Sequence, residues 1–126
     1  MKGPLKVTVV EAKNLKDEDV IGKSDPYIEL WLDKNYKQKT TTKSNTINPT
    51  YNETFTFHAD GQKYLHLKVM DKDLVSDDEI GEGKVELSKI KNGYLETESI
   101  TDDMLALLTA KSENEINQLF DKIHKN

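Results

Sequence analysis

Residues 65–73 have the sequence Leu65-His66-Leu67-Lys68-Val69-Met70-Asp71-Lys72-Asp73. Leu65, Leu67 and Val69 recur every second residue, which is typical of a strand with one buried face. The strand leads directly into Asp71 and Asp73, which are two residues apart and therefore project to the same side of an extended chain. This stretch therefore predicts a half-buried strand that leads into paired carboxylates.

Similar alternation recurs on both sides of this strand. It is found in residues 5–9, 28–32, 54–58 and, more weakly, 80–90. Turn-forming pairs such as Asn48-Pro49 and Asp60-Gly61 separate these segments. Residues 37–43 are rich in lysine and threonine, which favours an exposed edge strand. Many short strands with polar outer faces predict an all-β, antiparallel β-sandwich.

The last quarter of the sequence has a different pattern. Thr101 is followed by two aspartates, a helix-start signal, and then by Met104, Leu105, Leu107 and Leu108. A second apolar stripe has helical spacing and consists of Ile116, Leu119, Phe120 and Ile123. We expect a sandwich over residues 1–100 and an amphipathic helical extension over 101–126, packed on or next to the sandwich. The alternative is that this helix binds a partner or a second copy.

Composition narrows the class of protein. The 126 residues fit one domain, and the chain contains no cysteine for a disulfide or thiolate metal site. Neither a secretion signal nor a membrane-spanning run is apparent, so we expect a cytoplasmic protein whose membrane contact is peripheral and reversible. The net charge of -5 is unfavourable for binding nucleic acid, which is itself negatively charged. His58, His66 and His124 lie near no nucleophile motif, and we expect neither an enzyme nor a small-molecule substrate.

Two loops, residues 17–26 and 71–79, are dense in carboxylates. Both can lie at the same end of a sandwich, where like charges would repel unless a cation joined them. Oxygen donors without histidine or cysteine suit Ca²⁺ better than zinc or copper. The alternative is a set of solvated acidic turns. An EF-hand is excluded because Val75 and Ser76 stand where that loop needs a ligand and a glycine.

Several motifs in register resemble the C2 domain family. They are Ala12-Lys13-Asn14-Leu15, Gly22-Lys23-Ser24-Asp25-Pro26-Tyr27, Asn48-Pro49-Thr50-Tyr51-Asn52-Glu53-Thr54-Phe55, Met70-Asp71-Lys72-Asp73 and Asp78-Glu79-Ile80-Gly81. The resemblance covers about residues 4 to 90 and implies an eight-stranded antiparallel sandwich. No strand pattern precedes Leu5, so the circularly shifted, phospholipase-type topology is expected. That topology needs a final strand, which the sequence pattern does not identify.

The resemblance also implies a metal site that holds two or three Ca²⁺ ions. Its ligands would be Asp19, Asp25, Asp71, Asp73 and Asp78. The last acidic loop is one residue shorter than in synaptotagmin-like members, so Asp77 is an alternative to Asp78. All these positions are aspartate, which favours a calcium-binding member over a calcium-insensitive one.

Apolar residues at the expected loop tips point to a membrane. Val20 and Ile21 lie in the first acidic loop and Leu74 and Val75 in the later one, where they can insert between lipid headgroups. The alternative is that they fold back onto their own loops. A weaker candidate for phosphoinositide contact is a group of four lysines: Lys34, Lys37, Lys39 and Lys43. We therefore expect calcium-dependent binding to anionic phospholipid membranes. The rival function is a calcium-insensitive protein-interaction module.

Overall fold

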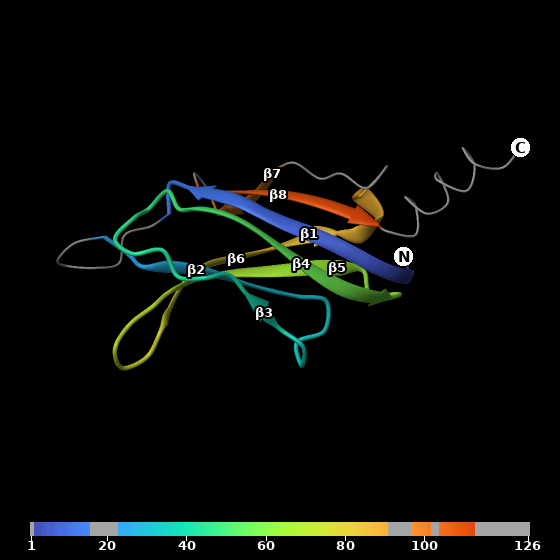
Figure 1. Cartoon of the computed structure of the whole chain (residues 1–126), viewed down its shortest axis with the longest axis horizontal. Coiled ribbons are helices and arrows are strands. Elements are labelled where there is room, and N and C mark those ends of the chain that lie inside the picture. Colours follow the sequence, from blue (N-terminus) through green and yellow to red (C-terminus); the bar gives the residue numbers. More distant parts are fainter. Residues whose placement is uncertain (1, 16–22, 91–96, 102–103, 113–126) are drawn as a thin grey trace, which may run out of the picture.

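The computed structural model of the chain describes residues 2–15, 23–90, 97–101 and 104–112 (Figure 1). Within these ranges the chain forms strands and one short 3-10 helix. In chain order they are β1 (Lys2–Lys13), β2 (Pro26–Trp31), β3 (Gln38–Lys39), β4 (Thr50–Asp60), β5 (Tyr64–Asp71), β6 (Asp78–Glu86), η1 (Leu87–Lys89), β7 (Thr97–Thr101) and β8 (Met104–Ser112). No helix in the described ranges is long and apolar enough to cross a bilayer.

The described strands form two four-stranded antiparallel sheets packed face to face (Figure 1). Sheet A has the order β4-β1-β8-β7, and sheet B has the order β3-β2-β5-β6. The expected all-β antiparallel sandwich is confirmed. The short β3 lies at an edge of sheet B, as the polar composition of residues 37–43 predicts.

The core lies between the two sheets and is built by the period-two alternation of the strands. Leu65, Leu67 and Val69 of β5 are fully buried, and the residues between them are half-buried on the outer face. From sheet A, Leu5 and Val7 of β1 are equally buried. Each such side chain contributes about 1.5–3 kcal/mol of hydrophobic stabilisation, so this alternation also determines which residue of each strand faces inward.

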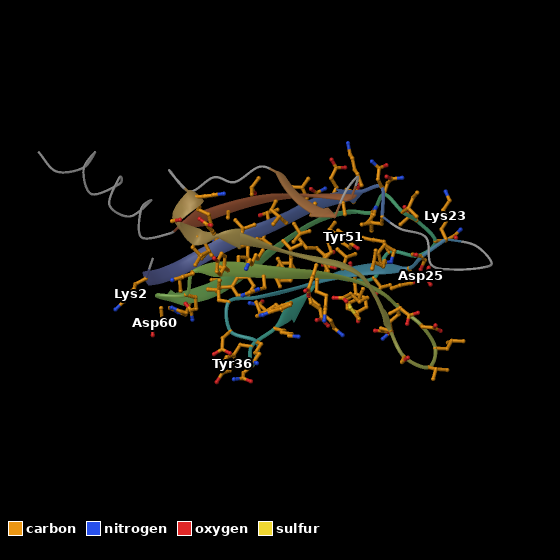
Figure 2. All side chains as sticks on the ribbon, turned by 180° about the vertical axis from the view of Figure 1, so that it is seen from behind. Lys2, Lys23, Asp25, Tyr36, Tyr51 and Asp60 are labelled. Carbon is orange, nitrogen blue, oxygen red and sulfur yellow. The ribbon has the colours of Figure 1, made fainter. Side chains whose placement is uncertain are left out.

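The register of sheet B brings three chain segments together at one end of the sandwich. Pro26 at the start of β2 pairs with Asp71 at the end of β5, and Asp71 pairs with Asp78 at the start of β6. The loops that adjoin these residues therefore share one end. Figure 2 shows Asp25 at this end and Asp60 at the other.

Residues 104–112 differ from their expected conformation. The sequence pattern predicts a helix beginning near Thr101, but Met104–Ser112 form strand β8, which pairs with β1 on one side and β7 on the other. Ala106, Leu108 and Ala110 are buried, which is a period of two. Alanine and leucine are strong helix formers, and pairing with two neighbouring strands outweighs that local preference.

The sandwich therefore extends beyond residue 100 to include β8, the final strand that the circularly shifted topology requires. The rest of the expected helical extension, residues 113–126, lies outside the described residues.

Candidate metal-binding loops

Asp25 and Asp71 are neighbours at the shared end of sheet B. The backbone amide of Asp25 donates to Oδ1 of Asp71 at 2.9 Å, and the amide of Lys72 donates to the Asp25 carbonyl oxygen at 3.0 Å. Asp71 is only 3% exposed and Asp25 is half-buried. Two expected ligands, 46 residues apart in the chain, are thus joined through hydrogen bonds.

A third loop, which follows β3, holds Asp25 from the other side. Oδ1 of Asp25 accepts the backbone amide of Asn45 at 2.6 Å, and the Asn45 side-chain oxygen accepts the amide of Lys23 at 2.7 Å. Asn45 has a φ of 54°, a left-handed conformation that asparagine tolerates better than most residues. No motif in the sequence identifies Asn45. Its only signal is an asparagine in a polar loop.

The loop after β5 is closed by its own aspartates. The amide of Leu74 donates to Oδ1 of Asp73 at 2.6 Å, and the amide of Asp73 donates to Oδ1 of Asp77 at 3.0 Å. The hydroxyl of Tyr27 donates to Oδ2 of Asp77 at 2.5 Å. This hydroxyl, followed by the Asp73 amide and the nearby Lys72 ammonium, lowers the pKa of Asp77 below its usual value.

Asp78 differs from Asp77 in position. It is the first residue of β6, directly opposite Asp71 in the ladder, and it is exposed. Asp73 is exposed as well. Asp19 lies outside the described residues, so its expected place as a ligand is not described.

The donor set at this end fits a hard cation, although no finished metal site is visible in it. No group of three or more histidine, aspartate or glutamate side chains within the described ranges is close enough to share one metal ion. What the structure provides is the joined pair of Asp25 and Asp71, with Asp73 and Asp78 on the adjoining segments. Carboxylate oxygens are the donors that Ca²⁺ prefers. A shared cation would need further donors or a small closure of the loops.

The tip of the loop after β5 is apolar and open to solvent. Leu74 and Val75 are 102% and 96% exposed, so they do not fold back onto the loop. Val20 and Ile21, the apolar residues expected at the other tip, lie outside the described residues. Two fully exposed aliphatic side chains in an acidic loop bury no apolar surface within the domain and therefore do not stabilise its core.

Two of the four expected lysines lie on the outer face of sheet B. The ammonium of Lys37 is 3.7 Å from a Glu29 carboxylate oxygen and 4.4 Å from the centre of the Trp31 ring. The ammonium of Lys39 is 5.6 Å from the ring centre of Tyr27. The charge of Lys37 is thus partly neutralised by Glu29, and the ammonium groups of both lysines lie over aromatic rings.

The other two lysines do not join this pair as one cluster. Lys34 is exposed in the turn after β2. Lys43 is half-buried, and its backbone amide donates to the Pro26 carbonyl at 3.0 Å, near the acidic end. The expected row of four lysines is therefore spread along the sheet from one end to the other.

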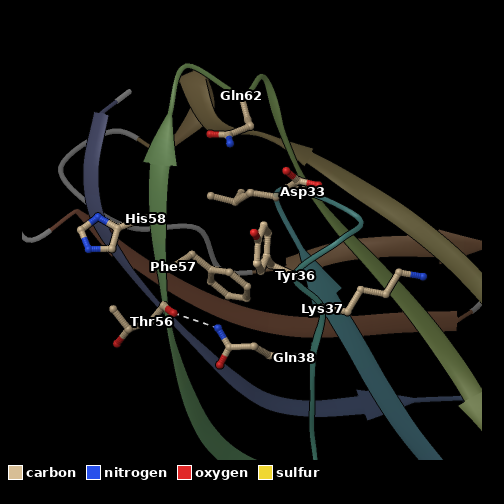
Figure 3. Close-up of a pocket in the computed structure, with 9 residues that line it drawn as sticks. Asp33, Tyr36, Lys37, Gln38, Thr56, Phe57, His58 and Gln62 are labelled. Carbon is tan, nitrogen blue, oxygen red and sulfur yellow. Dashed lines mark hydrogen bonds between the residues drawn. The ribbon is translucent and has the colours of Figure 1, made fainter.

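A pocket of about 550 Å³ lies at the far end of β2 from Asp25 (Figure 3). Leu32, which directly follows β2, and Phe57 of β4 line it together with Tyr36, which is 76% exposed. The side-chain amide of Gln38 donates to the Thr56 carbonyl at 2.8 Å and ties the two sheet edges together beside it. The pocket is separate from the acidic loops.

Comparison with known proteins agrees with this architecture. The family profile described as "C2 domain" matches residues 3–101. The chain belongs to the C2 domain family. The match begins at Gly3 in β1, continues to the end of β7 and stops before β8, the strand that the sequence pattern does not identify.

Individual C2 relatives are moderately similar in sequence. A calcium-dependent lipid-binding protein of Arabidopsis thaliana is 35% identical over an alignment of 126 positions, which covers 98% of this chain and 25% of that protein. Human synaptotagmin-1 is 40% identical over an alignment of 99 positions, which covers 75% of this chain and 23% of that protein. The chain thus spans about a quarter of the length of these relatives.

Solved structures share the fold. A C2 domain of plant extended synaptotagmin 1 superimposes with a TM-score of 0.76 at 25% identity, covering 86% of this chain and 92% of that domain. Human GIVD cytosolic phospholipase A2 gives a TM-score of 0.77 at 28% identity, over 87% of this chain but only 16% of the phospholipase. The likeness is therefore to a small part of that enzyme.

Proposed function

We propose that this C2 domain binds anionic phospholipid membranes when Ca²⁺ occupies its acidic loops. One observation carries the proposal: Leu74 and Val75 are fully exposed at the tip of the loop that begins with Asp71, beside the joined pair of Asp25 and Asp71. The Arabidopsis relative is named as a calcium-dependent lipid-binding protein, which supports the same function.

Charge accounts for the dependence on calcium. The chain carries a net charge of -5, so without metal the acidic end repels an anionic surface. Two Ca²⁺ ions would bring four positive charges to this end and reverse its local sign. Lipid phosphate oxygens can then complete the six to eight ligands that Ca²⁺ takes. Calcium and membrane must therefore raise each other's affinity.

The ligands proposed are Asp25, Asp71, Asp73 and Asp78, with Asp19 from the first acidic loop. Asp77 is the alternative to Asp78. Leu74 and Val75 would enter the membrane interface, together with Val20 and Ile21. Lys37 and Lys39 are candidates for a secondary contact with phosphoinositide headgroups, and breaking the Lys37–Glu29 ion pair would be part of its cost.

Sedimentation with liposomes tests the function. Vesicles that contain phosphatidylserine should pull down the protein in calcium and release it in EGTA, and Asp25→Asn with Asp73→Asn should abolish the pull-down. Asp33→Asn with Asp60→Asn, which also removes two negative charges but at the opposite end of the sandwich, is the matched control (Figure 2). Binding that survives both EGTA and the double substitution would show calcium-independent lipid binding and overturn the proposal. No binding to the vesicles in calcium would favour the calcium-insensitive protein-interaction module.

A further inference from the structure

Asp77 has both carboxylate oxygens engaged within the protein. Oδ2 accepts the Tyr27 hydroxyl at 2.5 Å and lies 3.8 Å from the Lys72 ammonium, while Oδ1 accepts the Asp73 amide at 3.0 Å. The two hydrogen bonds link β2 to both ends of the loop after β5. An oxygen that coordinated Ca²⁺ would have to give up or share one of these donors.

Tyr27 is a rigid anchor for this link. It is 5% exposed and belongs to β2, where it pairs with Met70 of β5. Only two side-chain torsions position its ring, so its hydroxyl has a well-defined place at the sheet surface. The bond to Asp77 spans 50 residues of sequence and ties the loop to the sheet rather than only to itself.

The link determines the position of an expected ligand. Asp77 holds the backbone of Asp73, and the Asp73 carboxylate in turn accepts the amide of Leu74. Asp78, by contrast, begins β6 opposite Asp71 and is exposed. The loop thus contains one aspartate directed to the sheet and another beside the ligand pair.

We propose that Tyr27 and Asp77 form a latch that positions the loop carrying Asp73 and Leu74, which leaves Asp78, the ligand that the family resemblance implies, as the last ligand of the proposed calcium site. Asp77 is then a positioning residue. This inference rests on the proposed calcium site for its role, but the latch itself exists without metal and can be tested without it.

Calcium titration calorimetry and amide hydrogen exchange on the whole chain test the latch. Tyr27→Phe should weaken calcium binding about tenfold, the effect of one hydrogen bond to a charged group. Asp77→Ala should weaken calcium binding by a similar factor. Tyr27→Phe combined with Asp77→Ala should bind calcium no more weakly than Asp77→Ala alone, because both changes break the same contact. Asp78→Asn should weaken binding more than any of these.

Tyr51→Phe is the matched control, since the buried Tyr51 hydroxyl donates to the Pro26 carbonyl at 2.6 Å and is not part of the loop. It should leave calcium affinity unchanged. In metal-free protein, the Asp73 amide should exchange several-fold faster in Tyr27→Phe than in Tyr51→Phe.

Two results would overturn the latch. One is a loss of calcium affinity in Asp77→Ala that is as large as the loss expected for Asp78→Asn, while Tyr27→Phe binds calcium as tightly as the Tyr51→Phe control. The other is unchanged exchange of the Asp73 amide in Tyr27→Phe. If the wild-type protein takes up no calcium, the proposed function fails, and the exchange measurement alone decides the latch.

Discussion

The backbone amide of Asp25 donates a hydrogen bond to the carboxylate of Asp71, and this 2.9 Å contact joins the start of β2 to the end of β5. Asp71 is nearly inaccessible to solvent. One carboxylate therefore has two roles: it completes the hydrogen bonding of a neighbouring strand and places a negative charge beside a second aspartate. The two roles can be separated by substitution.

Asp71→Ala should lower the free energy of unfolding in EGTA by about 1–3 kcal/mol, because it leaves the Asp25 amide without its acceptor. Asp71→Asn keeps an oxygen at that position and should cost less, yet it should lose calcium binding as Asp71→Ala does. Urea denaturation monitored by circular dichroism measures the difference. Equal destabilisation by the two variants would show that charge, not the hydrogen bond, stabilises this joint.

Calcium should raise the melting temperature of the wild-type protein, since the ion binds only the folded arrangement of loops. At about one hundred times the Kd, the gain is about 2.7 kcal/mol, or about 10 °C for a domain of this size. EGTA should reverse the shift. Differential scanning calorimetry of Asp25→Asn with Asp73→Asn should give no shift, and an equal shift in that variant would place the bound ion elsewhere.

Leu74→Ser with Val75→Ser should leave the melting temperature unchanged, because neither side chain is buried in the free protein. Liposome binding should fall at least tenfold, since burying one such side chain in a membrane contributes about 1.5–3 kcal/mol. Tyr36→Ser removes an exposed apolar side chain at the other end and should bind vesicles normally. If the double-serine variant bound vesicles as tightly as the wild-type protein, electrostatic attraction alone would hold the protein at the membrane.

Tyr27 should keep its proton in alkaline solution. Burial, followed by the hydrogen bond to Asp77, raises the pKa of Tyr27 above its usual value of about 10, and burial raises that of Tyr51. A raised folded pKa means that this stabilisation is complete below about pH 10 and is lost as the pH rises through the folded pKa. Absorbance at 295 nm should therefore show both phenols ionising only as the protein unfolds. Early ionisation that disappears in Tyr27→Phe would contradict the Asp77 contact.

Much of the fold is predictable from local patterns. The alternation of Leu65, Leu67 and Val69 predicts β5 because one face of that strand is polar. Strand β8 is not predictable in the same way: its buried Ala106 and Leu108 are good helix formers, and its extended form depends on β1, about 100 residues earlier. The conformational propensities of residues 104–112 carry no information about this distant pairing partner.

The candidate site, like the fold, is only partly predictable from the sequence. The aspartate motifs identify Asp25 and Asp71, and the register of sheet B then brings them together. The partners that hold the loops, Asn45 and Tyr27, are 20 and 50 residues from the aspartates that they contact. Such contacts arise only when loops from different strands meet. Sequence patterns therefore indicate the charged residues better than the residues that orient them.

The place of β8 between β1 and β7 also constrains how the polypeptide is made. During synthesis β1 leaves the ribosome first and can pair with β4 early, but its other edge stays open until Ser112 has emerged. A nascent chain that stops at Thr101 would present the unpaired backbone edge of β1, a strand of 12 residues, to any neighbour, which invites aggregation. Solubility of the newborn protein thus depends on a strand that is translated long after its partner.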